Sequence, residues 1–243
     1  MTQYEMSQGT LLGGKMAYKQ LRHGHRSGFE PVLMAALINA RPDETILEAG
    51  TGAGAALLCL AARLPLIRAI GIERDPTLAR LAALNISENG FKQLNVVTGD
   101  AACLPFAAQT FQHVMANPPW FGTHSTRPAD GLRALAHHAA PATLALWIAE
   151  LLRVLRDKGS ITLALPASSY AEATALLRPL CGGITLLPLW PRQGVKAKMI
   201  LIRAQKASHT PDSVLPGLIL HDDNGITPQA NAILRDGLAL VGA

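Results

Sequence analysis

The sequence has few cysteines and no long apolar run, and both shortages restrict what the protein can be. Its three cysteines, Cys59, Cys103 and Cys181, are scattered and odd in number, which fits free thiols in a reducing cytosol and offers no metal-ligand spacing. No run reaches the roughly 18 apolar residues of a membrane span, and the opening residues, MTQYEMSQGT, lack the apolar segment of a secretory signal. We therefore expect a cytoplasmic protein that neither binds a metal nor enters a membrane.

Acidic residues are missing from two stretches of the chain. Met6–Phe29 and Ala173–Pro211 contain no Asp or Glu, whereas Glu30–Asp100 is nearly balanced, and the whole chain has a formal net charge of +5. The basic residues of the two stretches are Lys15, Lys19, Arg22, Arg26, Arg178, Arg192, Lys196, Lys198, Arg203 and Lys206. Basic segments on both sides of a neutral core are typical of a surface that binds a polyanion such as RNA. Charge alone leaves a solvated basic face without a partner equally open.

A glycine-rich stretch, Thr45–Gly54, is the feature around which the rest of the chain is organised. It reads TILEAGTGAG: a short apolar run, then Glu48, then three alternating glycines, followed by a helix-forming segment that extends to Arg63. This order predicts a strand, a tight turn and a helix, because glycine tolerates the backbone angles of such a turn and lets a ligand approach closely. Glu73 follows about 20 residues later, where nucleoside-binding βαβ units carry the acid that accepts the ribose hydroxyls.

The spacing of this turn separates two kinds of nucleoside cofactor. Dinucleotide sites have the pattern G-x-G-x-x-G and aim a helix N-terminus at a pyrophosphate. Here the pattern is E-x-G-x-G-x-G, in which Glu48 precedes Gly50, Gly52 and Gly54. A carboxylate at that point would repel a pyrophosphate but suits a ligand with an ammonium group. S-adenosylmethionine is such a ligand, because it has a sulfonium, an ammonium and a ribose but no phosphate.

Alternating strand and helix patterns predict an α/β fold with a doubly wound, seven-stranded Rossmann-like sheet. No helix precedes the last strand, so we expect that strand to run antiparallel. We expect one domain over 1–243, with an N-terminal segment and helix (1–44, irregular to residue 28), a core (45–206) and a C-terminal extension (207–243). The expected strands are 45–49, 68–72, 94–98, 111–116, 160–165, 184–189 and 199–203, and possible extra pairing involves 218–221. The expected helices are 30–40, 53–63, 75–90, 143–155, 169–177 and 227–240.

Four polar residues follow or end strands of this predicted sheet: Glu48, Glu73, Asp100 and Asn117. Ligands of open α/β sheets bind beyond the carboxyl ends of the strands, near the point where the strand order reverses. The four side chains are therefore expected to meet at one edge of the sheet. Their convergence is stronger evidence for a cofactor site than any one of them.

The turn Asn117–Trp120, with the sequence NPPW, predicts the chemistry of the site. Its two prolines stiffen it, since each fixes φ, and a residue before a proline is biased toward an extended conformation. The Asn117 side-chain oxygen and the Pro118 carbonyl can then act as two fixed acceptors for the hydrogens of a planar exocyclic amino group. Accepting both hydrogens stabilises charge that develops on this poor nucleophile during an in-line displacement. Trp120 offers a face on which a planar substrate stacks.

Together these motifs resemble the class I S-adenosylmethionine-dependent methyltransferases. EAGTGAG at Glu48–Gly54, Glu73, Asp100 and NPPW at Asn117–Trp120 carry the resemblance, and NPPW is similar to the (D/N/S)PP(Y/F/W) motif of amino-group N-methyltransferases. The segment RHGHRSGFEPVLMAALI before the glycine turn, and KMILIRAQK with GLILHDDNGITPQANAIL near the end, are similar to the bacterial tRNA1(Val) adenine-N6 methyltransferase family. That family usually has Asp where Phe29–Glu30 stands and Tyr at the position of Trp120.

The resemblance implies a role for each motif. Glu48 and the glycines would line the methionine end of S-adenosylmethionine, Glu73 would bind the ribose hydroxyls and Asp100 the adenine amino group. Asn117 with Pro118 and Pro119 would hold the target nitrogen, and Trp120 would stack on the base. The substrate implied is an adenine in RNA, in the anticodon loop of tRNA, where a partly unstacked base is flipped at lower cost. Candidate RNA contacts are Arg22, Arg26, Arg127, Arg133, Lys196 and Lys198.

Other interpretations remain open at this stage. The protein could methylate a glutamine amide in a protein, since such enzymes share an NPPY motif, or the N2 amino group of guanine in rRNA. A non-catalytic binding protein is a third possibility, against which the intact NPPW turn argues. Arg127 and Arg133 bracket a Gly- and Pro-containing loop that could cover the substrate or simply lie exposed, and His137–His138 lacks a nearby third metal ligand.

Overall fold

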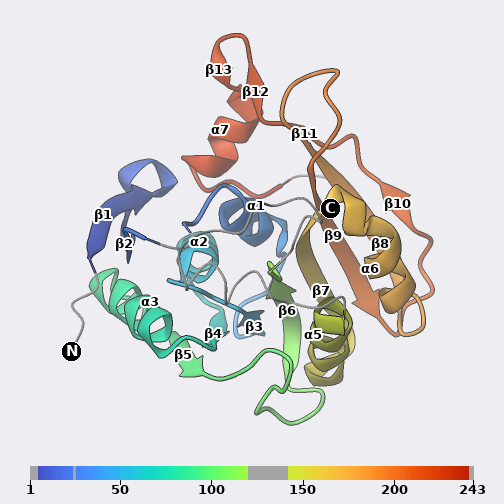
Figure 1. Cartoon of the computed structure of the whole chain (residues 1–243). Helices are drawn as coiled ribbons and strands as arrows, with labels where there is room; N and C mark the ends of the chain where they lie inside the picture. The colour runs from blue at the N-terminus through green and yellow to red at the C-terminus, as the bar shows by residue number, and fades with distance from the viewer. Residues whose placement is uncertain (1–4, 24–25, 120–141, 241–243) are drawn as a thin grey trace.

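The computed structural model describes residues 5–23, 26–119 and 142–240, and a single large β-sheet forms its centre (Figure 1). Among these residues the sheet has nine strands in the order β10-β8-β9-β7-β6-β3-β4-β5, with β11 also paired to β8. The ladders from β7 across to β5 are parallel, and β9 is antiparallel to both of its neighbours. The long strands are β3 (Thr45–Ala49), β4 (Arg68–Glu73), β5 (Leu94–Thr98), β6 (Phe111–Ala116), β7 (Leu155–Pro166), β8 (Cys181–Trp190) and β9 (Met199–Lys206).

The predicted α/β fold with a mostly parallel sheet is therefore confirmed, and so is the antiparallel last long strand. The sheet also includes two strands of two residues each on β8, beyond the seven that the sequence predicts. These are β10 (Ser213–Val214) and β11 (Leu218–Ile219). A separate small hairpin near the C-terminus pairs β12 (His221–Asp222) with β13 (Gly225–Ile226).

Helices cover the sheet, and successive side chains of a strand enter different cores because they point to opposite faces. On β3, Ile46 packs in the core that contains residues of α1 and α2, and Leu47 packs in the core that contains residues of α5 and α6. The helices are α1 (Glu30–Leu37), α2 (Ala55–Arg63), α3 (Pro76–Glu88), α5 (Ala142–Val154), α6 (Tyr170–Leu177) and α7 (Pro228–Leu234). In the part of the chain that the structure describes, no helix has the length and apolarity needed to span a membrane.

The predicted helices differ from the observed ones mainly at their ends. The helix after the glycine-rich turn begins at Ala55, later than expected, because Gly54 has a left-handed φ of 88° and still belongs to the turn. Asp75, the first residue of the predicted helix 75–90, is the N-cap of α3, and its carboxylate accepts a hydrogen bond from the Thr77 N–H at 2.7 Å. The last helix ends at Leu234, well before the predicted end.

The expectation that residues 1–28 are irregular is wrong. β1 (Met6–Leu11) and β2 (Met16–Leu21) pair antiparallel over their whole length, and Figure 1 shows this hairpin beside α3. Gly13 and Gly14 lie in the turn of the hairpin, with φ values of 64° and 99°. The glycines therefore mark the reversal between two strands, and the strands on either side are regular.

The segment between β8 and β9 lies at the same edge of the sheet as the carboxyl ends of the parallel strands. Pro166, the last residue of β7, is paired with Met199, the first residue of β9. Because β8 is antiparallel to β9, its last residue, Trp190, also reaches this edge. The basic segment 191–198 is thus brought to the edge where the predicted cofactor residues end their strands.

At the opposite edge of the sheet, His113 of β6 contacts Ser160 of the neighbouring strand β7 and Glu44, the residue before β3. Its Nδ1 lies 2.7 Å from Ser160 Oγ and its Nε2 lies 2.9 Å from Glu44 Oε2, while the residue is only 8% exposed. Burial lowers the pKa of His113, with a smaller lowering effect from the Arg203 charge, against the hydrogen bond and charge of Glu44. The imidazole is therefore held neutral over a wider pH range than a free histidine.

We predict that the contribution of His113 to the free energy of unfolding falls as the pH is lowered from 7.5 to 5.5. Since the folded-state pKa of His113 lies below its ordinary value of 6.5, the unfolded chain takes up a proton first as the pH drops through 6.5. The stabilisation present above that pH is lost as the pH approaches the folded-state pKa. Each pKa unit of lowering corresponds to about 1.4 kcal/mol, which urea titrations at several pH values would measure.

The difference in the free energy of unfolding between the wild type and His113→Gln isolates this contribution, because glutamine has no titrating ring, and it should decrease as the pH is lowered. His209→Gln is the matched control, since His209 is exposed, and its difference from the wild type should stay constant. A difference between the wild type and His113→Gln that does not change between the two pH values would contradict the assignment.

Candidate functional site

The glycine-rich turn after β3 is fixed by hydrogen bonds to the neighbouring strand. The backbone N–H groups of Gly50 and Thr51 both donate to the Ile72 carbonyl, at 2.9 and 3.0 Å. Gly50 has φ of 70°, and a Cβ on it would lie 2.7 Å from the Trp147 ring, so no larger residue fits there without rearrangement. Gly52 has φ of 57°, but nothing lies within 4 Å of the position of its Cβ. The turn thus packs tightly against Trp147 of α5 at Gly50, whereas there is free space beside Gly52.

Glu48 is a carboxyl group buried beneath this turn. It is 4% exposed, and its Oε2 accepts a hydrogen bond from Thr51 Oγ1 at 2.6 Å. Burial raises the pKa of Glu48 to about 8, against the smaller opposing effect of the Thr51 hydrogen bond. A cationic group placed beside Glu48 would stabilise the ionised carboxylate, whereas an anion would not.

Glu73, at the carboxyl end of β4, holds the turn to the start of α3. Its Oε2 accepts from the Gly52 N–H and its Oε1 from the Asp75 N–H, both at 2.9 Å. A carboxylate can accept about four hydrogen bonds, so Glu73 retains capacity for hydroxyl donors of a ligand. The carboxylate therefore shapes the turn and remains able to bind.

Asp100 lies one strand further along the same edge. The Gly99 N–H donates to the Glu73 carbonyl at 3.0 Å, and Asp100 Oδ1 accepts from the Ala102 N–H at 2.9 Å. Asp100 is exposed. Glu48, Glu73 and Asp100 thus lie at or just beyond the ends of three consecutive strands of the sheet, β3, β4 and β5, as the sequence predicts.

Asn117 follows β6 and has a side-chain oxygen without a partner. Its Oδ1 is buried and makes no hydrogen bond to any atom of the described residues. Pro118 beside it is buried, and Pro119 is exposed. A buried polar atom without a partner is costly, and an N–H donor from a ligand would remove that cost. Among the described residues, Gln20 Oε1 and Thr162 Oγ1 are also buried without a partner. Neither belongs to the residues that the sequence predicts for the site.

The basic residues divide into a surface group and an internal group. Arg22, Arg26, Lys196 and Lys198 are exposed. By contrast, Lys206 Nζ donates to two backbone carbonyls at 2.7 Å each. Burial lowers the pKa of the Arg203 guanidinium. Lys206 and Arg203 therefore do not belong to the basic surface that the second acid-free stretch was expected to form. Trp120, Arg127, Arg133 and His137–His138 lie outside the described residues.

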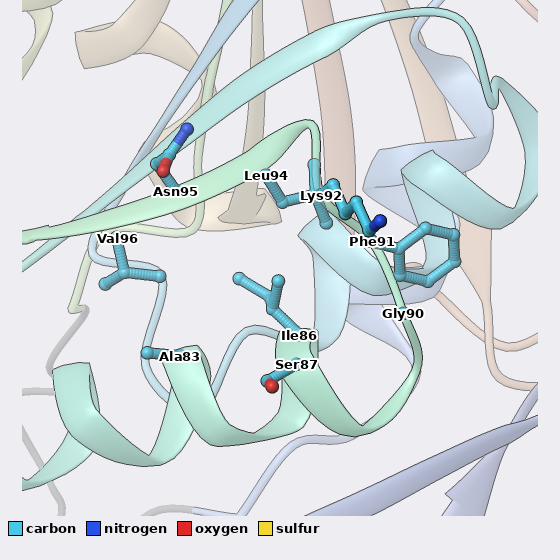
Figure 2. Close-up of a pocket in the computed structure, with 9 residues that line it drawn as sticks. All are labelled: Ala83, Ile86, Ser87, Gly90, Phe91, Lys92, Leu94, Asn95 and Val96. Carbon is cyan, nitrogen blue, oxygen red and sulfur yellow. The ribbon is translucent and has the colours of Figure 1, made fainter.

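A hollow in the described part of the chain lies away from these residues. It has a volume of about 460 Å³ and is lined by residues of α3, including Ala83 and Ile86, and by the segment Phe91–Val96. Figure 2 shows it between the helix and the edge strand β5. None of the predicted site residues lines it. The site at the strand ends is therefore recognised by the polar atoms described above, and this hollow is separate from it.

Comparisons with known proteins agree with this geometry. Residues 46–159 match the model of a methyltransferase domain. The chain is 28% identical over 207 residues to a tRNA1(Val) (adenine(37)-N6)-methyltransferase of Actinobacillus succinogenes, covering 80% of this chain and 84% of that one. It is 31% identical over 150 residues to an enzyme of the same name from Porphyromonas gingivalis, covering 58% of each chain.

The fold is also found among solved structures. A predicted O-methyltransferase from Agrobacterium tumefaciens superposes with a TM-score of 0.71 at 24% identity, over 86% of this chain and 96% of that one. The matched domain contains the glycine turn, Glu48, Glu73, Asp100 and Asn117. The chain therefore carries a methyltransferase domain at residues 46–159, and its motifs, its sheet and these relatives resemble the S-adenosylmethionine-dependent methyltransferases, among them the bacterial tRNA1(Val) adenine-N6 methyltransferases.

Proposed function

We propose that the protein methylates the exocyclic N6 amino group of an adenine in RNA, in the anticodon loop of a tRNA. The observation that carries this proposal is the buried Oδ1 of Asn117, an acceptor without a partner among the described residues at the carboxyl end of β6. An amino group on a planar base has two N–H donors, and one of them would satisfy this oxygen. The carbonyl of Pro118 would accept the other.

The cofactor residues fit a nucleoside with a charged amino-acid tail. Glu48 and the glycines of the turn would face the methionine end, where a buried carboxyl group suits an ammonium. Glu73, with unused acceptor capacity beside Gly52, would bind the ribose hydroxyls. Asp100, exposed at the end of the next strand, would accept from the adenine amino group. S-adenosylmethionine supplies a methyl group bound to a sulfonium, and the neutral thioether of S-adenosylhomocysteine is a good leaving group.

The residues of the chain contribute mainly by position and by accepting hydrogen bonds. The target nitrogen is a poor nucleophile because its lone pair is delocalised into the base. As the new C–N bond forms and the S–C bond breaks, positive charge grows on that nitrogen and its N–H donors become stronger. Asn117 Oδ1 and the Pro118 carbonyl would then stabilise the transition state more than the bound substrate. The surplus proton passes to water.

An RNA substrate is supported by charge at the correct edge of the sheet. Exposed Lys196 and Lys198 lie in the segment between β8 and β9, which reaches the edge where β6 ends. The relatives described above are named as adenine(37)-N6 methyltransferases of a tRNA, which favours adenine over guanine and over a glutamine amide. We further propose that Arg22, Arg26, Arg127 and Arg133 contact the RNA backbone and that Trp120 stacks on the flipped base.

The proposal is tested by transferring a labelled methyl group to total RNA and to total protein from a strain that lacks this gene. We expect label in RNA, and nucleoside mass analysis should identify N6-methyladenosine. Asn117→Ala should lower turnover by about 10²–10³, the usual cost of losing one transition-state hydrogen-bond partner, with S-adenosylhomocysteine affinity nearly unchanged. Label that enters only protein would overturn the substrate, and a variant that retains turnover within a few-fold would overturn the role of Asn117.

A second prediction concerns salt. Phosphate contacts release counterions, so affinity for RNA should fall with a log–log slope of about −0.7 for each contact to a single strand. Replacing both Lys196 and Lys198 by Gln should flatten this slope and raise the KM for RNA, while the affinity for S-adenosylhomocysteine stays the same. Lys158→Gln with Arg156→Gln is a matched double control, because these exposed residues lie near the opposite end of β7. Equal effects of the two double variants would contradict an RNA surface at segment 191–198.

A third prediction links cofactor binding to proton release. Without a ligand the pKa of Glu48 is raised to about 8 by burial, so the carboxyl group is mostly protonated at pH 7. An ammonium bound beside it would lower that pKa, and Glu48 would lose its proton. Calorimetry of S-adenosylhomocysteine binding at pH 7 should therefore give enthalpies that differ between phosphate and Tris, and Glu48→Gln should remove much of the difference. Binding without proton release in the wild type would refute the position of Glu48 at the ammonium.

A further inference from the structure

Two side-chain amides on α3 hold the N-terminal hairpin as a neighbouring strand would. Asn85 Oδ1 accepts from the Lys19 N–H at 2.9 Å, and Asn85 Nδ2 donates to the Lys19 carbonyl at 2.8 Å. One helical turn later, Asn89 makes the same pair of bonds with the backbone of Ala17, at 3.0 and 2.8 Å. The backbone N–H and carbonyl groups of Ala17 and Lys19 on β2 are therefore hydrogen-bonded to two side-chain amides, one in α3 and one at its C-cap. An ion pair between Lys19 and Glu88 lies beside them.

Asn85 makes one more contact, which Asn89 does not. Its Nδ2 also donates to the carbonyl of Ala53 at 2.9 Å, and Ala53 lies between Gly52 and Gly54 in the glycine-rich turn. Asn89 Nδ2 instead gives its second hydrogen bond to the Asn85 carbonyl within α3. Asn85 is completely buried, and its three bonds use both N–H donors of the amide and one acceptor site of its oxygen. A single amide thus joins the hairpin, the helix and the turn.

The turn is consequently fixed from two sides. Glu73 accepts from the N–H of Gly52 at 2.9 Å, and Asn85 donates to the carbonyl of the next residue, Ala53. These two side chains hold two consecutive residues, Gly52 and Ala53, of a segment whose glycines have positive φ values. Ordering a glycine-rich backbone costs more conformational entropy than ordering other residues. Contacts that order the turn before a ligand binds therefore reduce the entropy that is lost on binding.

We propose that Asn85 is a positioning residue that sets the conformation of the cofactor turn through Ala53 and couples this turn to the hairpin β1–β2. The coupling is direct, because the amide that accepts from Lys19 donates to Ala53. Binding of the S-adenosyl cofactor at the turn therefore stabilises the docked hairpin, and loss of the docked hairpin weakens cofactor binding by the same factor. This inference rests on the cofactor assignment and not on the RNA substrate.

Hydrogen exchange on the wild-type protein tests the coupling without any substitution. S-adenosylhomocysteine should slow exchange in the turn and also at the amides of Lys19 and Ala17, which donate to Asn85 and Asn89. The amide of Gly183, which donates to the Thr210 carbonyl at the far side of the sheet, should exchange at the same rate with and without the ligand. Slower exchange in the turn with no change at Lys19 would overturn the proposal.

A pair of variants separates positioning from mere docking of the hairpin. Asn85→Ala and Asn89→Ala each remove one pair of bonds to β2, and both should lower the melting temperature. Only Asn85→Ala also removes the contact with Ala53, so its Kd for S-adenosylhomocysteine should rise about three- to tenfold, the range expected for one net hydrogen bond. The Kd of Asn89→Ala should change less than twofold.

Equal losses of affinity in the two alanine variants would mean that only hairpin docking matters, and would overturn the proposal. Should Asn85→Ala fail to fold, Asn85→Asp keeps the acceptor for the Lys19 N–H and lacks the amide donor to Ala53. Its affinity should fall in the same way, and wild-type affinity in Asn85→Asp would refute the positioning role.

Discussion

The carboxylate of Glu73 is the interaction on which the site depends. One oxygen accepts from the turn at Gly52 and the other from Asp75 at the N-terminus of α3, so one side chain sets the distance between the glycine-rich turn and this helix. A carboxylate is suited to this because it has acceptor capacity left after both bonds are made. A neutral residue of the same size could make one of these bonds as an acceptor but would place a donor where the second N–H lies.

The two edges of the parallel sheet differ in how their polar groups are satisfied. At the amino edge, His113, Ser160 and Glu44 satisfy one another, which is the usual condition of buried polar atoms. At the carboxyl edge, Asn117 Oδ1 is buried without a partner among the described residues and Glu48 is a buried carboxyl group. These costs lower stability and are characteristic of a surface prepared for a ligand. The same sheet therefore has one edge that stabilises the fold and one at which we propose the cofactor and substrate bind.

Sequence reasoning reached the sheet and the strand ends because both depend on local patterns. Thr45–Ala49, Leu94–Thr98 and Phe111–Ala116 are short apolar runs with clear boundaries, and their bounds are identical in the structure. The hairpin β1–β2 was missed because its stability comes from Asn85 and Asn89, far away in the chain, and not from a strong alternation of its own. For the same reason no local pattern indicates that Lys206 is used internally, since its bonds to Leu152 and Leu155 exist only after β9 pairs with β7.

The docking of the hairpin also has a consequence for the order in which the chain can fold. Lys19 and Asn85 are 66 residues apart, and Ala17 and Asn89 are 72 apart. During synthesis the hairpin emerges first, but a two-stranded hairpin alone is marginally stable, and its partner helix leaves the ribosome several seconds later at about 5–20 residues per second. Until α3 has formed, β2 exposes an unpaired strand edge with apolar Met16 and Leu21, which are buried in the native protein. The N-terminal hairpin must therefore wait for a helix that is synthesised after it, and chaperone binding to this segment would be useful during translation.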